Sequence, residues 1–268
     1  PRMSTVYHLR GLLKLLQHFW VIDNDLYDGD ETYMSGTIEV SDATIKDFNN
    51  VGWGRISFDE GFNYSSNVAA TILSQRLGKE KLNEYYTKFG FGTKTGITLP
   101  DEVNGSIKFN YPTEIATAAF GQGITTTPIQ NIQALTTIAN DGIMLKPYIV
   151  SKIVDSNTKK VKYEAKREEL GQVVKKSTTD KMKEMMHNVV TSGKTDARLF
   201  RSNLVNIIGK SGTAQIANPN GGGYLTGTYD YIRSFAMLFP YDDPKYIIYF
   251  SVKQFEGPYK EAANAVVN

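Results

Sequence analysis

The segment Val205-Asn206-Ile207-Ile208-Gly209-Lys210-Ser211-Gly212-Thr213-Ala214-Gln215 predicts a β-strand that carries polar side chains after an apolar start. Lys210 and Ser211 bring a cation and a hydroxyl to one sheet edge, where a substrate carboxylate can bind. Gly212 has no side chain, so a substrate backbone can lie against that edge. A phosphate-binding loop does not fit, because its pattern needs a glycine at position 204, which is leucine.

Two more strands are predicted over residues 232–239 and 246–254, and turn residues separate all three strands. Consecutive strands joined in this way pair antiparallel. Helices are expected over residues 67–77 and 79–89, from Thr127-Pro128 to Asp141, and from about Ser177, and a hairpin is expected over 149–154 and 161–163. The predicted fold class is α/β of the α+β kind: an antiparallel sheet flanked by helices, plus a helical subdomain, in one domain over residues 1–268.

A second polar group, Ser65-Ser66-Asn67, opens the helix predicted over residues 67–77. Serine and asparagine are preferred helix caps, so the group has a purely structural interpretation. A hydroxyl and an amide at a helix start can also relay protons and hold a peptide carbonyl. The sequence of this group alone does not separate the two interpretations.

The surrounding residues decide between the two interpretations, because four groups of residues stand around Ser65-Ser66-Asn67 in a fixed order along the chain. They are Phe58-Asp59-Glu60-Gly61-Phe62, Phe120-Gly121-Gln122-Gly123, Ile138-Ala139-Asn140-Asp141-Gly142 and Lys210-Ser211-Gly212-Thr213-Ala214-Gln215. From about Asp23 to its end, the chain resembles the transpeptidase domain of class B penicillin-binding proteins, the division or sporulation type of Gram-positive bacteria. The resemblance implies a β-lactamase/transpeptidase-like fold with the site between sheet and helical subdomain.

The resemblance also implies a peptidoglycan D,D-transpeptidase that works through a serine acyl-enzyme, without metal or cofactor. A serine attacks the D-Ala-D-Ala bond of a stem peptide and passes the acyl group to a neighbouring stem amine, and β-lactams trap the same serine. Ser65 would relay protons and Asn67 would hold the substrate amide. The substrate or drug carboxylate would lie on Lys210, Ser211 and Thr213, beside Gly212. Division proteins are possible further partners.

The nucleophile motif of the family, Ser-x-x-Lys, is where the sequence departs from the pattern. Ser4, in Pro1-Arg2-Met3-Ser4-Thr5-Val6-Tyr7, stands 61 positions before Ser65, as the resemblance requires, but Tyr7 occupies the place of the lysine. Ser4 is nevertheless the candidate nucleophile. The literal match Ser156-Asn157-Thr158-Lys159 lies in a polar turn and is a coincidence.

Residues 6–21 keep apolar helical spacing, with Lys14 and Gln17 expected largely on another face. The amino-acid sequence of residues 1–22 is nevertheless atypical of the family. Two explanations stay open: a shifted reading frame or cloning artefact over this segment, or a diverged homologue.

Composition excludes several classes of protein. The 30 basic and 28 acidic residues are interspersed and give a net charge of +2, without the basic stripe that nucleic acid requires. The chain has no cysteine, and its three histidines do not pair at metal-ligand spacing, so neither disulfides nor a zinc site is expected. No apolar run is long enough to span a membrane. The family's members carry a membrane anchor, so we expect an extracytoplasmic catalytic domain of a cell-membrane protein, with the anchor outside this sequence.

Two other functions remain as alternatives. A catalytically silent homologue would bind stem peptides or division partners without turnover, and the absent lysine after Ser4 favours it. A β-lactamase or β-lactam sensor would share the fold and the motifs. The groups at 120–123 and 138–142 favour the transpeptidase over this second alternative.

Overall fold

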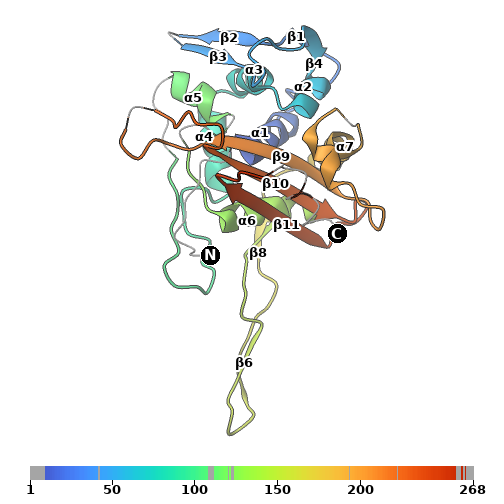
Figure 1. Cartoon of the computed structure of the whole chain (residues 1–268). Helices are drawn as coiled ribbons and strands as arrows, with labels where there is room; N and C mark the ends of the chain where they lie inside the picture. The colour runs from blue at the N-terminus through green and yellow to red at the C-terminus, as the bar shows by residue number, and fades with distance from the viewer. Residues whose placement is uncertain are drawn as a thin grey trace.

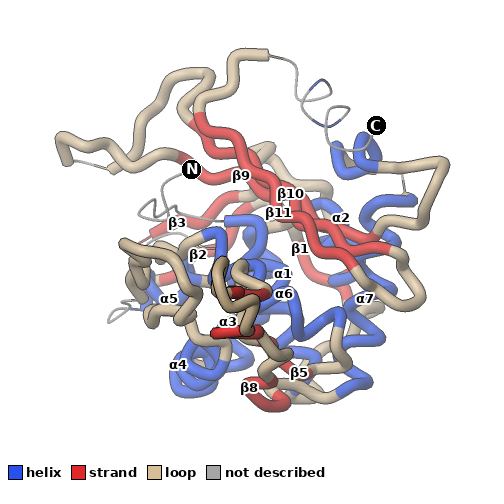
Figure 2. The backbone as a smooth tube through the Cα atoms, turned by 90° about the horizontal axis from the view of Figure 1, so that it is seen from below, coloured by secondary structure: helices blue, strands red, loops and turns tan. Residues whose placement is uncertain are grey.

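The three C-terminal strands form one antiparallel sheet in the order β11-β10-β9. The structure is a computed structural model that describes residues 10–41, 43–107, 112–119, 121, 124–192, 194–221, 223–257, 261 and 263. The strands β9 (Ile208–Gln215), β10 (Tyr231–Phe239) and β11 (Tyr246–Lys253) lie side by side in Figure 2, with Ser211 opposite Phe235 and Phe235 opposite Phe250. Among the described strands, β9 is therefore an edge. The predicted antiparallel sheet is confirmed, although β9 begins at Ile208 and not at Val205 as predicted.

Helix α1 (Arg10–Asp23) is the central helix of the core, and it packs against both β9 and α3 (Asn67–Leu77). Every residue from position 12 to position 21 is buried. Trp20 stacks on Tyr85 with ring centroids 5.6 Å apart. The helix predicted in this region is confirmed, but the expectation of a separate polar face is wrong: Lys14 and Gln17 are buried as well. A helix that is covered on all sides has no solvent face for its polar residues.

In the helical subdomain, α3 lies above the sheet in Figure 1, and the subdomain contains the helices predicted over residues 67–77 and 79–89. These are α3 and α4 (Lys79–Lys88), which meet at Gly78, where φ is 80° and a left-handed turn favours glycine. Helix α2 (Phe58–Tyr64) precedes them, and α5 (Pro112–Ala118) packs against α3. Two short pairs that were not predicted, β1 (Thr32–Met34) with β4 (Arg55–Ser57) and β2 (Thr37–Val40) with β3 (Ala43–Lys46), complete it.

The later helices, α6 and α7, begin at or next to the start signals that the sequence predicts. Helix α6 (Pro128–Ala139) begins after Thr127, whose hydroxyl accepts from the Gln130 amide in a capping box, with Pro128 in the first turn. Helix α7 (Lys176–Thr191) begins one residue before the predicted Ser177 and buries Met182, Met185 and Met186. The short helix η1 (Asp196–Phe200) then leads back to β9.

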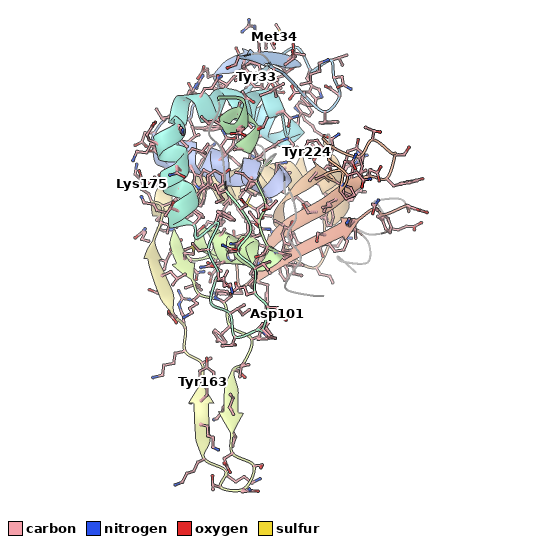
Figure 3. The ribbon with its side chains drawn as sticks, turned by 90° about the vertical axis from the view of Figure 1, so that its left-hand side faces the viewer. Tyr33, Met34, Asp101, Tyr163, Lys175 and Tyr224 are labelled. Carbon is pink, nitrogen blue, oxygen red and sulfur yellow. The ribbon has the colours of Figure 1, made fainter. Side chains whose placement is uncertain are left out.

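A two-stranded ribbon extends from the body of the molecule (Figure 1). It consists of β6 (Lys152–Val154) and β7 (Val161–Glu164), the hairpin that the sequence predicts, and every residue of both strands is exposed. The ribbon is joined to the body through β5 (Ile143–Leu145) and β8 (Glu169–Gln172). Figure 3 shows Tyr163 on the ribbon, far from Tyr33 and Met34 at the opposite end of the molecule.

Candidate active site

Among the residues that the structure describes, Lys14 is the lysine whose amine is hydrogen-bonded to Ser65. Its side chain projects from α1, is 7% exposed, and donates hydrogen bonds from Nζ to the Ser65 carbonyl at 2.5 Å and to the Ser65 Oγ at 3.3 Å. The fully buried residues around it, Leu13, Leu15 and Leu16, fix the helix and therefore the amine. The structure thus brings together a lysine and a hydroxyl, the pair that moves protons in serine acyl transfer.

Ser65 occupies the turn between α2 and α3 in a left-handed conformation, with φ 59° and ψ 43°. Non-glycine residues adopt this region rarely, and they do so most often where the surroundings impose it. Here the Ser65 N–H donates to Phe62, and the next N–H, of Ser66, donates to Gly61 at 2.8 Å. These two hydrogen bonds end α2 and turn Ser65 towards α1.

The cap of α3 is Ser66, and its hydroxyl accepts from the Ala69 N–H at 3.0 Å. The same hydroxyl donates to Asp47 Oδ1 at 2.8 Å, which also accepts from the Asn67 N–H at 2.7 Å. Asp47 is 1% exposed, and its other oxygen accepts from Gly36 N–H at 2.8 Å. A buried carboxylate at a helix N-terminus therefore fixes the turn that holds Ser65.

Asn67 is the first residue of α3, and its side-chain Nδ2 donates to the Lys46 carbonyl at 2.6 Å. Helix capping and the contact with Lys14 are therefore divided within Ser65-Ser66-Asn67. Ser66 caps the helix, Ser65 contacts Lys14, and Asn67 is tied to the end of β3.

Lys210 lies on β9 and is 2% exposed, with Nζ 5.7 Å from the centre of the Phe62 ring. Burial lowers the pKa of Lys210 to about 7, because removal from water disfavours the charged amine. Side chains alternate along a strand. Lys210 and Gly212 are therefore on the buried face of β9, whereas Ser211 is half-buried and Thr213 exposed.

His18 lies close enough to both lysines for their charges to act on it. Its Nδ1 donates to the Lys14 carbonyl at 2.7 Å, and its ring packs edge-on against Phe62 at 4.9 Å. Burial, and to a smaller extent the nearby Lys210 and Lys14, lower the pKa of His18 to about 3. A neutral ring whose Nδ1 carries the proton leaves an unprotonated Nε2, and this atom is buried without a hydrogen-bond partner among the described residues.

Not all predicted site residues can be placed. Ser4 and Tyr7 lie outside the described residues, as do Phe120, Gln122 and Gly123. Ser65, Asn67 and Lys210 lie around α1, with Ser211, Gly212 and Thr213 along the edge strand. The sequence analysis missed Lys14, Asp47 and His18. The signal for Lys14 was a charged residue inside the apolar run Leu12-Leu13-Lys14-Leu15-Leu16, where a lysine is costly unless it has a partner.

Two kinds of feature are not found among the described residues. No group of three or more His, Asp or Glu side chains there could hold a metal ion. None of the described helices combines the length and the apolar character that crossing a bilayer demands.

Comparison with known proteins identifies the family. The sequence model of the penicillin binding protein transpeptidase domain matches residues 13–268. Stage V sporulation protein D of Bacillus subtilis is 35% identical over 231 residues, which are 85% of this chain and 35% of that protein. The Mycobacterium tuberculosis protein PbpB is 29% identical over 92% of this chain and 37% of its own length. The chain thus spans little more than a third of these relatives.

Solved structures agree with this assignment. Penicillin binding protein 2X from Streptococcus thermophilus superposes with a TM-score of 0.92 at 30% identity, over 99% of this chain and 40% of that one. Penicillin binding protein 3 from Mycobacterium tuberculosis, complexed with ampicillin, superposes with a TM-score of 0.86 at 26% identity, over 98% of this chain and 62% of that one. The β-lactamase/transpeptidase-like fold is confirmed, and the chain belongs to the family of penicillin-binding protein transpeptidase domains of class B.

Proposed function

We propose that this domain serves peptidoglycan D,D-transpeptidation, and that the junction of α1, α3 and β9 binds the D-Ala-D-Ala end of a stem peptide. The observation that carries the proposal is the contact of the buried Lys14 amine with the Ser65 hydroxyl and carbonyl. A buried amine costs folding free energy, so a lysine retained at a hydroxyl inside the core points to a functional role for the pair.

The roles follow from the geometry and from the family's reaction. Lys14 would take up the proton of an attacking hydroxyl, and Ser65, within 3.3 Å of it, would pass a proton to the leaving amine. Ser211 and Thr213 would donate hydrogen bonds to the substrate carboxylate, the Lys210 amine on the buried face of the same strand would attract it by its charge, and the flat edge at Gly212 would accept the peptide backbone. Asn67 would hold the substrate amide from the α3 side.

β-Lactams are the second proposed class of ligand. The related penicillin binding protein 3 of Mycobacterium tuberculosis is known in complexes with aztreonam and with ampicillin. A β-lactam carries a carboxylate next to a strained amide, so the groups proposed to hold a stem peptide fit it equally. We further propose an extracytoplasmic location at the cell membrane, where the substrate is, and association with division proteins.

Calorimetric titration of a D-Ala-D-Ala-ended stem peptide into the protein tests the proposal. Lys210→Ala should weaken binding by about 1.5 to 3 kcal/mol, the range for hydrogen bonds to charged groups. The matched control is Lys166→Ala, which removes an exposed lysine outside the site. Equal affinities in the two variants would remove Lys210 from the ligand site and contradict the proposal.

A further inference from the structure

A hollow of about 360 Å³ lies between the second half of α4 and the loop over residues 91–107. Pockets that hold small ligands have volumes in this range. None of the residues assigned to the stem-peptide site lines the hollow, so it is a second concave feature of the domain. Its neutral polar side chains are those of Asn83, Thr87, Asn104 and Ser106.

Both walls of the hollow are fixed by hydrogen bonds within the protein. On the α4 side, the Tyr86 hydroxyl donates to the Ala118 carbonyl at 3.0 Å. On the loop side, the backbones of Ser106 and Thr125 exchange two hydrogen bonds, at 2.9 and 3.0 Å. Gly105 permits this close approach, because a Cβ there would collide with the Thr125 carbonyl oxygen. A preformed pocket loses little conformational entropy when a ligand binds.

The polar side chains of the hollow are available to a neutral ligand. Within the described part of the chain, the Asn83 amide and the Ser106 hydroxyl make no hydrogen bond to another residue. The Asn104 amide nitrogen donates to the Gly92 carbonyl at 2.9 Å, and its oxygen is left as an acceptor. None of the described lining residues carries a charge, so a phosphate or a carboxylate would find no counter-ion.

The deep part of the hollow is apolar. Tyr86 and Phe91 are 1% and 4% exposed, and their rings pack edge-on with centroids 6.0 Å apart. Ile107 lines the hollow beside them. A sugar ring has C–H groups on its faces and hydroxyls around its edge, so it fits an apolar floor with polar groups at the rim. An acetamido substituent adds a methyl group for the floor and an amide that can pair with the Asn83 amide.

We infer that this hollow binds an N-acetylated sugar of the peptidoglycan glycan strand. The inference rests on the proposed function, because the glycan strand carries the stem peptides on which the domain would act. Tyr86 lines the hollow and also packs edge-on against Trp20 of α1, with ring centroids 4.8 Å apart. A sugar bound there would hold the strand beside the helix that carries Lys14.

Calorimetric titration with tri-N-acetylchitotriose tests the inference, and maltotriose, which lacks acetamido groups, is the control sugar. Asn83→Ala should weaken chitotriose binding about tenfold, as expected for the loss of two hydrogen bonds. Position 83 is exposed on α4 and alanine favours helix, so the variant should fold. The matched control is Asn188→Ala, which removes an exposed asparagine of α7 and should leave the affinity unchanged.

A second variant tests the position of the sugar by occupying its space. Thr87 lines the hollow from an exposed position of α4, so Thr87→Trp should fill the hollow and abolish chitotriose binding. Affinity for a D-Ala-D-Ala-ended stem peptide, measured on the same proteins, should be the same in all of them, because none of the substituted residues belongs to the stem-peptide site.

Three results would overturn the inference. They are equal chitotriose affinities in Asn83→Ala and Asn188→Ala, equal binding of maltotriose and chitotriose, and chitotriose binding that persists in Thr87→Trp. Absence of chitotriose binding in a protein that binds the stem peptide would also overturn it and would leave the proposed function intact. If chitotriose binds through Asn83 and the stem peptide does not bind, the sugar site is supported and the proposed function fails.

Discussion

The α1 junction and the β6–β7 ribbon both contain lysines, but in opposite surroundings. At the junction, Lys14 and Lys210 are 7% and 2% exposed, and their amines contact named groups on neighbouring elements. On the ribbon, the Lys152 and Lys162 side chains are 45% and 65% exposed and pair with Glu164 and Asp155. The comparison shows that burial holds the two junction lysines in defined positions, and that it lowers the pKa of one of them, Lys210.

The same contrast extends to the cost of each arrangement. Exposed ion pairs contribute little, because water screens them and two long side chains must be ordered. Buried amines and carboxylates must be paired, and the surrounding core must hold their partners in place. The junction should therefore be sensitive to single substitutions, and the ribbon should tolerate them.

The largest expected effect comes from the packing of α1. Trp20→Ala removes a side chain that is fully buried between Tyr85, Tyr86 and Phe89. A Trp-to-Ala change in a core costs about 3 to 5 kcal/mol in free energy of unfolding. Urea denaturation followed by circular dichroism measures it.

The matched control for Trp20 is on the ribbon. Tyr163 is 39% exposed, so Tyr163→Ala should change the free energy of unfolding by less than about 0.5 kcal/mol. If the two variants are equally destabilised, α1 is not the core helix that the structure gives.

Asp47 should produce the next largest effect. Asp47→Ala leaves the Ser66 hydroxyl and the Asn67 and Gly36 N–H groups without their acceptor. We expect a loss of about 1.5 to 3 kcal/mol in free energy of unfolding. Stem-peptide affinity should fall in parallel, because the turn that carries Ser65 loosens.

Asp47→Asn separates the two effects, since it keeps an acceptor oxygen and removes the charge. It should retain most of the affinity and lose part of the stability. An alanine variant with unchanged ligand affinity would show that Asp47 supports the fold without positioning Ser65.

Local signals in the sequence predicted the elements around the site well. An apolar run followed by polar residues located β9, and Thr127-Pro128 located the start of α6. The strands β1 to β4 were not predicted, because three or four residues are too few for an alternating pattern to stand out. Ser65 and Asn67 were found through their motif.

The site residues that the sequence analysis did not predict are defined by tertiary contacts. Lys14 was assigned to a polar face, since helical spacing says where a residue points along its own helix but not what covers that face. Its partner Ser65 is 51 residues away in sequence. Asp47 likewise acts on α3 from the end of another strand, and no local pattern links the two.

The lowered pKa of Lys210 predicts opposite pH dependences for binding and stability. The carboxylate of a ligand is attracted by the protonated amine, so affinity should fall as pH rises through about 7, by at most tenfold per pH unit. Stability should rise from pH 7 towards the ordinary lysine value of 10.5, because the unfolded state binds the proton that the folded state has lost.

Lys210→Met removes the titrating group and should remove both dependences in that window. His18 stays neutral in the folded state above its pKa of about 3, so it does not affect the binding curve, and its own contribution to the pH dependence of stability ends near the ordinary histidine value of 6.5, at the lower edge of the window. Calorimetry and thermal melting from pH 6 to 9 measure the two curves. If the methionine variant shows the same pH dependence of affinity and of stability as the unchanged protein, the titrating group is not Lys210.

A smaller effect is expected from the cap of α3. Ser66→Ala removes the acceptor for the Ala69 N–H and should cost about 1 kcal/mol in free energy of unfolding. The control is Thr127→Ala, which removes the corresponding cap of α6. Both variants should melt lower, but only Ser66→Ala should weaken stem-peptide binding. Equal affinities would make Ser66 an ordinary cap.

The smallest effect is expected from removal of the whole ribbon. The backbone of Ala165 donates to Ser151 at 2.8 Å, so the two strands are already close at the base, and a short glycine-rich turn can replace residues 152–164. Every residue of β6 and β7 is exposed, so the deletion removes little buried apolar surface. Shortening an exposed loop changes its closure entropy only slightly, and we expect a change within about 1 kcal/mol in free energy of unfolding. Stem-peptide affinity should match that of the full chain, because none of the site residues lies in the deleted segment. A marked loss of affinity on ribbon removal would mean that the two regions are coupled and that the contrast drawn between them is wrong.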